Sequence, residues 1–124
     1  MSQRYNVFSV EDDIGLFELI ALTLKKLPVD VHHAKSGAEA LKLIPQMDVD
    51  VLILDITLPD MHGWDVLKEL SALKIRLKGV IVLTGHTESA HRVMAHFQDV
   101  TAYINKPFKP AELRNAIRTA LSST

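Results

Sequence analysis

The chain has no cysteine, which excludes a disulfide framework and any metal site built on thiolates. Only 6% of its residues are aromatic, and no apolar run approaches the roughly 18 residues that a membrane-spanning helix needs. The first residues also lack the charged and then apolar pattern of a signal peptide. The formal net charge of −1 gives no general attraction to nucleic acid or to an anionic membrane. We therefore expect a cytoplasmic protein with no membrane insertion and no direct contact with nucleic acid.

What the sequence does contain is a regular alternation of strand-like and helical patterns. Five apolar runs alternate with five helical patterns, which predicts an α/β fold with a doubly wound five-stranded parallel sheet. The five strands are expected at Tyr5–Val10, Val29–Ala34, Val49–Asp55, Gly79–Thr84 and Thr101–Ile104. No linker, repeat or low-complexity tract interrupts the pattern. We expect a single domain over residues 1–124.

Capping residues and prolines delimit the first two helices. The first is expected from about Ile14 to Leu27, with Asp13 as its N-cap and Pro28 as its stop. The second opens on the capping-box signature Ser36-Gly-Ala-Glu39 and is limited by Pro45.

The later helices are recognised by their buried faces. The third is expected to begin near Gly63, and Pro110 suits the first turn of the last helix. Apolar residues at helical spacing define the inward faces of the last three helices: Val66, Leu67, Leu70 and Leu73; Ala90, Val93, Met94 and Phe97; and Leu113, Ile117, Ala120 and Leu121.

The first helix carries more apolar residues than one buried face needs. One set is assigned to the core: Leu16, Leu19, Ile20, Thr23 and Leu27. A second apolar strip then remains beside the acidic strand ends: Ile14, Phe17, Ala21 and Leu24. Exposed apolar strips often mark docking surfaces.

Acidic residues stand at the ends of two predicted strands. Asp55 ends the apolar run Val51–Leu54, and Glu11 and Asp12 directly follow Val10. The carboxyl ends of parallel strands meet at one edge of the sheet, where open α/β folds bind their ligands. The acids therefore share a site if the two strands are neighbours. Three carboxylates in a small volume recruit a hard cation such as Mg²⁺, which also bridges to phosphate oxygens.

Four motifs in order resemble the receiver domain of two-component response regulators. They are Glu11-Asp12, Asp55-Ile-Thr-Leu-Pro-Asp-Met-His-Gly63, Leu83-Thr-Gly85 and Asn105-Lys-Pro-Phe108. Each is weak alone, but together they cover essentially the whole chain. The resemblance implies a flavodoxin-like (βα)5 fold with strand order 2-1-3-4-5. It also implies a phosphoacceptor signalling domain, not a turnover enzyme, that is phosphorylated by a histidine kinase or a histidine phosphotransfer protein.

The same resemblance assigns the acids their roles. Asp55 is the phosphoacceptor, and Asp12 binds Mg²⁺ directly with help from Glu11. The backbone carbonyl of Thr57 is a further ligand, and Mn²⁺ can substitute for Mg²⁺. Together Mg²⁺ and Lys106 supply a charge of +3, which balances the three carboxylates.

The remaining roles concern the phosphoryl group and its readout. The resemblance implies that Lys106 pairs with the phosphoryl group and that the Thr84 hydroxyl bonds a phosphoryl oxygen. It also implies a cis bond between Lys106 and Pro107. Tyr103 turns inward when Thr84 moves, which changes the surface of the fourth helix, fifth strand and fifth helix for a downstream protein partner. The alternative is a fixed, half-buried tyrosine.

Two further roles concern the lifetime of the signal and its donor. The resemblance implies that His86 and Thr57 tune dephosphorylation. We expect Ile14, Phe17 and Ala21 to dock the kinase or phosphotransfer protein, unless Phe17 folds back on its own domain.

Three rival functions are weighed against this one. A haloacid-dehalogenase hydrolase needs a general acid where Thr57 stands, and a flavodoxin-like cofactor phosphate would be repelled by Glu11-Asp12-Asp13. An inactive pseudo-receiver that acts only through protein contacts is the remaining alternative. Whether the chain acts alone or belongs to a longer regulator or hybrid kinase stays open.

Overall fold

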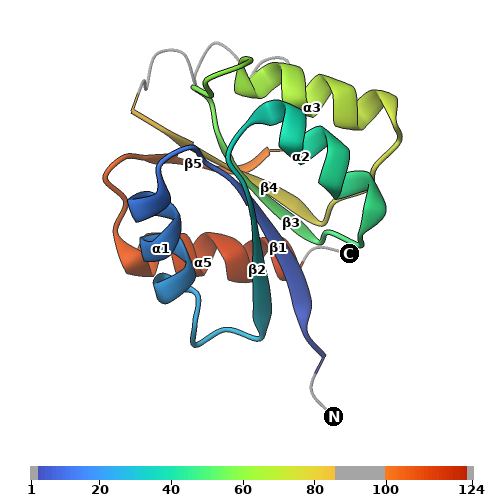
Figure 1. Cartoon of the computed structure of the whole chain (residues 1–124). Coiled ribbons are helices and arrows are strands. Elements are labelled where there is room, and N and C mark those ends of the chain that lie inside the picture. Colours follow the sequence, from blue (N-terminus) through green and yellow to red (C-terminus); the bar gives the residue numbers. More distant parts are fainter. Residues whose placement is uncertain (1–2, 86–99, 123–124) are drawn as a thin grey trace.

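The computed structural model describes residues 3–85 and 100–122. Its strands are parallel and form one sheet in the order β2-β1-β3-β4-β5 (Figure 1). Their bounds are Tyr5–Val10 for β1, Val29–Ala34 for β2, Val51–Asp55 for β3, Gly79–Thr84 for β4 and Val100–Asn105 for β5. The predicted five-stranded parallel sheet and its strand order are confirmed.

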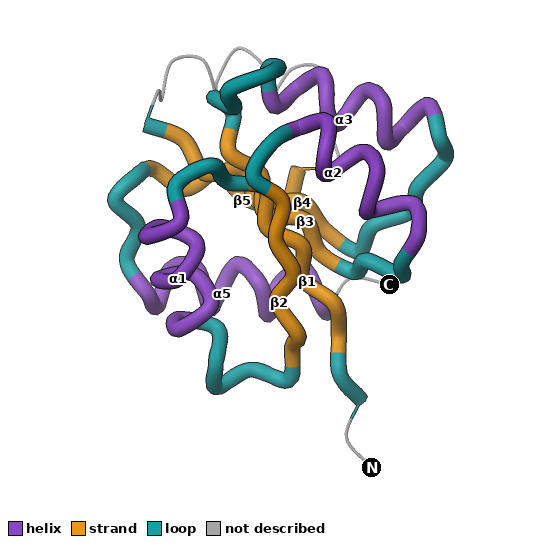
Figure 2. Tube along the Cα trace, in the orientation of Figure 1, coloured by secondary structure: helices purple, strands orange, loops and turns teal. Residues whose placement is uncertain are grey.

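Helices cover both faces of this sheet (Figure 2). Their bounds are Ile14–Thr23 for α1, Gly37–Leu43 for α2, Gly63–Ala72 for α3 and Pro110–Leu121 for α5, with a short 3-10 helix, η1, at Ile44–Gln46. On one face lie α1 and α5, and on the other lie α2 and α3 (Figures 1 and 2). The predicted fourth helix and His86 lie outside the described residues. Within residues 3–85 and 100–122, no helix combines the length and the apolar character that crossing a bilayer requires.

The central strand β3 explains why both faces need cover. All five of its residues are buried. Val51 and Ile53 pack in the core layer of α1 and α5, whereas Leu52 and Leu54 pack in the layer of α2 and α3. Successive strand side chains point to opposite faces, so a strand apolar at every position serves two core layers at once.

Helix α1 is shorter than the sequence predicted. It ends at Thr23 instead of Leu27. After the C-cap Leu24, N–H groups donate to the carbonyl three residues earlier: Lys25 N to Leu22 O (3.3 Å) and Leu27 N to Leu24 O (3.0 Å). The chain therefore leaves the α-helix through tight turns before it reaches Pro28.

Two assignments on α1 were wrong. Leu19, placed in the core by spacing, is 45% exposed, and Leu24, placed on the second strip, is completely buried. The helix is apolar almost all round, so periodicity did not single out its inward face. Packing against the sheet selected Ile20 and Leu24 instead.

Other boundaries moved by one or two residues. Strand β3 begins at Val51, and β5 is one residue longer at each end than expected. Leu73, expected on the inward face of α3, follows the helix and is 54% exposed. The predicted N-caps of α1 and α2 are confirmed: Asp13 Oδ1 accepts from Leu16 N and Ser36 Oγ accepts from Glu39 N, both at 3.1 Å.

Candidate functional site

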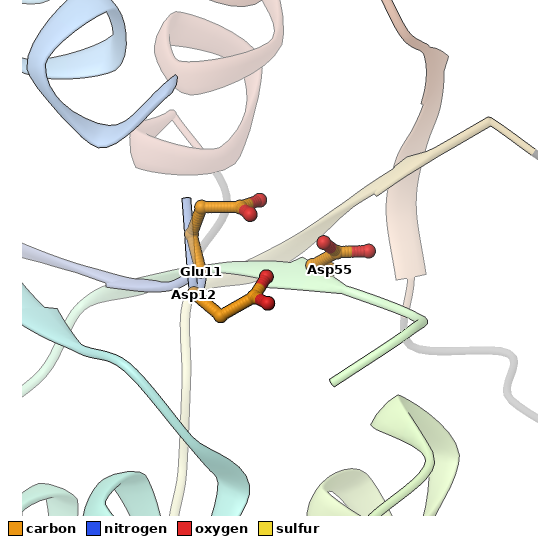
Figure 3. Close-up of side chains that lie close together, drawn as sticks. All are labelled: Glu11, Asp12 and Asp55. Atoms are coloured by element: carbon orange, nitrogen blue, oxygen red, sulfur yellow. The ribbon is translucent and has the colours of Figure 1, made fainter. Parts of the chain in front are cut away.

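The strand order brings the acidic residues together. Strands β1 and β3 are neighbours, with Val10 opposite Leu54, so the residues after β1 lie beside the end of β3. One carboxylate oxygen from each of Glu11, Asp12 and Asp55 lies within 4.8 Å of the others. Figure 3 shows the carboxylates of Glu11 and Asp12 extending to the side on which Asp55 lies. The shared acidic site predicted from the sequence is present.

These acids differ in burial. Glu11 is 2% exposed and Asp55 is 5% exposed, whereas Asp12 is open to solvent. A buried carboxylate is costly unless it is paired or hydrogen-bonded. The partners of Glu11 and Asp55 therefore decide what the site can do.

Lys106 supplies the counter-charge. Its Nζ lies 2.7 Å from Asp55 Oδ2 and 3.4 Å from Glu11 Oε2. The other oxygens accept backbone N–H groups: Asp55 Oδ1 from Thr57 (3.0 Å) and Glu11 Oε1 from Asp13 (3.1 Å). Lys106 follows β5, and its bond to Pro107 is cis, as the resemblance implied.

This arrangement shifts two pKa values. Burial, with a smaller effect from the charge of Asp55, raises the pKa of Glu11 to about 7, against the opposing effects of the Asp13 N–H and of Lys106. Burial lowers the pKa of Lys106, but its hydrogen bond to Asp55 and the charges of Asp55 and Glu11 outweigh burial and raise it. Lys106 is thus held as a cation. Without a second cation, one buried acid is only partly ionised near neutral pH.

The predicted switch residues lie on the two strands beyond β3. Thr84 ends β4 and is buried, and Tyr103 on β5 pairs with Val82. The Tyr103 ring is half-buried against Trp64, with ring centroids 6.4 Å apart. Its hydroxyl is buried and forms no hydrogen bond within the described residues, and burial raises its pKa.

The expected docking strip is only partly exposed. Ile14 is 45% exposed, whereas Phe17 and Ala21 are half-buried. The Phe17 ring stacks on His33, with centroids 4.0 Å apart and planes 6° apart. Phe17 therefore does fold back on its own domain. The exposed apolar surface of α1 continues at Leu22, which is 66% exposed.

Sequence reasoning gave no site role to two residues of the loop after Asp55. The Asp60 carboxylate accepts from the backbone N–H groups of Gly37 and Ala38, both at 2.9 Å, and these bonds hold its pKa below the usual range. A Cβ on Gly63 would lie 2.7 Å from the Asp55 carbonyl oxygen. The local sequence marks these residues as a turn and a helix start. Only the fold shows that they anchor the loop that leaves Asp55.

Comparison with known proteins gives one consistent family. Residues 7–118 match the sequence profile of the response regulator receiver domain. SilR of Salmonella typhimurium, described as a transcriptional regulatory protein, is 35% identical over 115 residues, which are 93% of this chain and 50% of SilR. The DNA-binding response regulator MtrA of Mycobacterium tuberculosis is 32% identical over 122 residues, which are 97% of this chain and 52% of MtrA. The chain therefore spans about half the length of these curated relatives.

A solved structure shows the same likeness. The signal receiver domain of a Vibrio parahaemolyticus protein described as a Luxo repressor superposes with a TM-score of 0.86 at 29% identity. The superposition covers 96% of this chain and 91% of that one.

Proposed function

This chain belongs to the response regulator receiver domain family, and we propose that it receives a phosphoryl group on the carboxylate of Asp55. The observation that carries this proposal is the setting of Asp55. It is buried at the end of β3, its oxygens are held by Lys106 Nζ and the Thr57 N–H, and two further acids lie beside it. These contacts fix the Asp55 carboxylate in place. Glu11 and Asp12, which follow β1, offer further cation ligands.

The donor set fits Mg²⁺, or Mn²⁺ in its place. It consists of carboxylate oxygens from Glu11, Asp12 and Asp55, and such hard ligands suit small divalent cations. The backbone carbonyl of Thr57 is proposed as a further ligand. When bound, the ion neutralises negative charge on the carboxylates and on the phosphoryl oxygens. With a cation bound there, Glu11 would be held in its ionised form.

In the proposed phosphoryl transfer, Asp55 is the residue that forms a covalent bond, and the other site residues act through charge and hydrogen bonds. An Asp55 carboxylate oxygen attacks phosphorus and forms an O–P bond, while the P–N bond of a phosphohistidine donor, or the P–O bond of acetyl phosphate, breaks. The bonding pair leaves with the imidazole or with acetate. The Nζ of Lys106 lies 2.7 Å from Asp55 Oδ2 before transfer, and we propose that it pairs with a negatively charged phosphoryl oxygen after transfer. We propose that the Thr84 hydroxyl donates a hydrogen bond to a second phosphoryl oxygen.

The proposed readout of phosphorylation runs through Thr84 and Tyr103. Thr84 ends β4 opposite Asn105 of β5, and Tyr103 lies two residues before Asn105 on that strand. A shift of Thr84 toward the phosphoryl group changes the space available to the Tyr103 ring and hence the β5–α5 surface. That surface is proposed to bind the downstream protein partner. His86, proposed with Thr57 to tune dephosphorylation, lies outside the described residues.

The proposed phosphoryl donor is a histidine kinase or a histidine phosphotransfer protein that docks on α1. Ile14, Phe17 and Ala21 lie on this helix, close in sequence to the acids, and Ile14 is the most exposed of the three. Replacing Ile14 with arginine is expected to slow transfer from the protein donor and to leave labelling by acetyl phosphate unchanged. Equal slowing with both donors would argue against docking at this residue.

The absence of nucleic-acid contact is proposed for the receiver fold alone. SilR is described as a transcriptional regulatory protein and MtrA as DNA-binding, and about half of each lies outside the match. DNA binding, where a longer protein performs it, is proposed to reside in that other half.

The direct test of the acceptor is mass spectrometry after incubation with acetyl phosphate and Mg²⁺. Wild-type protein is expected to gain one phosphoryl group, about 80 Da, because a fixed carboxylate beside a cation is a competent nucleophile. Asp55→Asn, which keeps the side-chain volume but removes the nucleophile, is expected to gain none. Labelling that persists in Asp55→Asn would overturn the assignment. A pseudo-receiver would leave both proteins unlabelled.

A further inference from the structure

His33 makes a contact to the acidic site that its sequence position does not suggest. It lies one residue before the end of β2, at the edge of the sheet. Its Nε2 lies 2.6 Å from the backbone carbonyl oxygen of Glu11. A carbonyl oxygen only accepts, so Nε2 carries the hydrogen and donates it.

The reason for this bond is the way the β1–β2 ladder ends. The last ladder contact runs from Glu11 N to Ala34 O, at 3.0 Å. The chain then turns into α2, with Ser36 as N-cap, so β2 offers no further backbone donor to the next carbonyl of the first strand. That carbonyl is the one of Glu11, and the imidazole of His33 takes the place of the missing N–H.

The same carbonyl belongs to the peptide unit that joins Glu11 to Asp12. Asp12 is exposed, so the direction of its carboxylate depends on the backbone that carries it. A hydrogen bond to that peptide unit limits its rotation and thereby limits where Asp12 can point.

Phe17 holds the imidazole in its place. The two rings are stacked at 4.0 Å, and Phe17 follows Asp13 by one helical turn, with its N–H bonded to Asp13 O at 3.0 Å. His33 therefore contacts both ends of the short segment that contains Asp12: the Glu11 carbonyl before it and the first turn of α1 after it.

We propose that His33 is a positioning residue for the metal-binding acids. Its Nε2–H fixes the Glu11–Asp12 peptide plane, and the stacked Phe17 ring fixes the imidazole. This inference rests on the proposed metal site, because it concerns how tightly that site holds its cation. Groups behind metal ligands commonly govern affinity in this way.

The test is Mn²⁺ binding, followed by the loss of the free-ion electron paramagnetic resonance signal at about pH 8, above the pKa of Glu11. His33→Leu keeps an apolar side chain against Phe17 but removes the donor, and it is expected to weaken Mn²⁺ binding about tenfold. His33→Gln, whose amide can donate from a similar distance, is expected to stay near wild type. His32→Leu is the matched control, because the neighbouring His32 bonds instead to Asn6 Oδ1, at 3.0 Å.

Labelling by acetyl phosphate gives a second readout. The Mg²⁺ concentration for half-maximal labelling is expected to rise about tenfold in His33→Leu, with the rate at saturating Mg²⁺ preserved. A merely structural role of His33 would instead lower the folded fraction of His33→Leu, and with it the labelled fraction at saturating Mg²⁺, which would overturn the inference.

Two outcomes would overturn the inference while leaving the metal site intact. The first is wild-type affinity in His33→Leu, and the second is equal weakening in His33→Leu and His33→Gln. Absence of Mn²⁺ binding by the wild-type protein would instead overturn the metal site, and this inference with it.

Discussion

The Nζ atom of Lys106 lies 2.7 Å from Oδ2 of Asp55, so one ion pair joins the end of β5 to the end of β3 across the intervening strand β4. The Lys106 side chain is 27% exposed and that of Asp55 only 6%. In the metal-free protein this lysine is the cation that neutralises the buried acids. If the site binds Mg²⁺ as proposed, the ion would take over part of that task.

Replacing Lys106 tests how the neutralisation of the buried acids is shared between the lysine and a bound cation. In Lys106→Met the free energy of unfolding without metal is expected to fall by about 2 kcal/mol, because two buried carboxylates lose their counter-charge. Added Mg²⁺ is expected to stabilise the variant more than the wild type, because the ion no longer meets a neighbouring ammonium group. Urea unfolding with EDTA or with Mg²⁺ measures both effects. Lys68→Met, at an exposed position of α3, is the control, and equal stabilisation of Lys106→Met and wild type by Mg²⁺ would contradict the argument.

Stability of the metal-free protein is expected to depend on pH through Glu11. Its pKa is about 7 in the folded protein and 4.5 as an ordinary carboxyl, so the folded state binds the proton more tightly. The contribution is therefore fully present below about pH 4.5 and is lost as pH rises to about 7. Its size is on the order of 3 kcal/mol for this one group. Urea unfolding across this range in EDTA measures it.

The corresponding variant is Glu11→Gln. It is expected to remove this pH dependence and, in the absence of metal, to be more stable than wild type above pH 7, because it buries an amide in place of a carboxylate. It is also expected to bind Mg²⁺ more weakly. The proposed cause would be excluded if the metal-free stability of the wild type rose between pH 4.5 and 7 and Glu11→Gln removed that rise.

A substitution of Gly63 tests how closely the start of α3 approaches the end of β3. A methyl group there would lie 2.7 Å from the Asp55 carbonyl oxygen and 2.8 Å from Ile56 Cα, and neither backbone atom can move freely. Gly63→Ala is expected to lower the free energy of unfolding by about 3 kcal/mol, the upper range for overpacking. Gly85→Ala is the control, since a Cβ there meets no atom of residues 3–85 and 100–122 within 4 Å. Equal unfolding curves for the two variants would refute the close approach.

The buried hydroxyl of Tyr103 has no hydrogen-bond partner within the described residues. Tyr103→Phe is therefore expected to raise the free energy of unfolding by about 1 kcal/mol, since the cost of burying that hydroxyl disappears. Trp64, the one tryptophan of the chain, reports unfolding by its fluorescence and packs on this ring. Tyr103→Leu, which loses the ring contact, is expected to be less stable than either. A loss of stability in Tyr103→Phe would show that the hydroxyl is satisfied.

Much of the fold follows from local patterns in the sequence. Strand β3 is apolar at every position before Asp55, and such a run requires helices on both faces of the sheet. The N-caps Asp13 and Ser36 were also evident, because a side chain that accepts from a backbone N–H two or three residues later acts locally.

The inward face of α1 did not follow from its sequence. The helix is apolar nearly all round, so spacing alone placed Leu19 inside and Leu24 outside, and both assignments were wrong. Which side of such a helix is buried is settled by the sheet against which it packs.

The acids themselves were determined by the sequence, because a carboxylate that directly follows a buried strand has to emerge at the edge of the sheet. Their partners were decided only by the tertiary structure. Lys106 reaches Asp55 across β4, and His33 reaches the Glu11 carbonyl because the β1–β2 ladder stops there. The physical reason is that a hydrogen bond or ion pair depends on distances of a few ångströms between side chains that are far apart along the chain, and only the packing of the strands sets those distances.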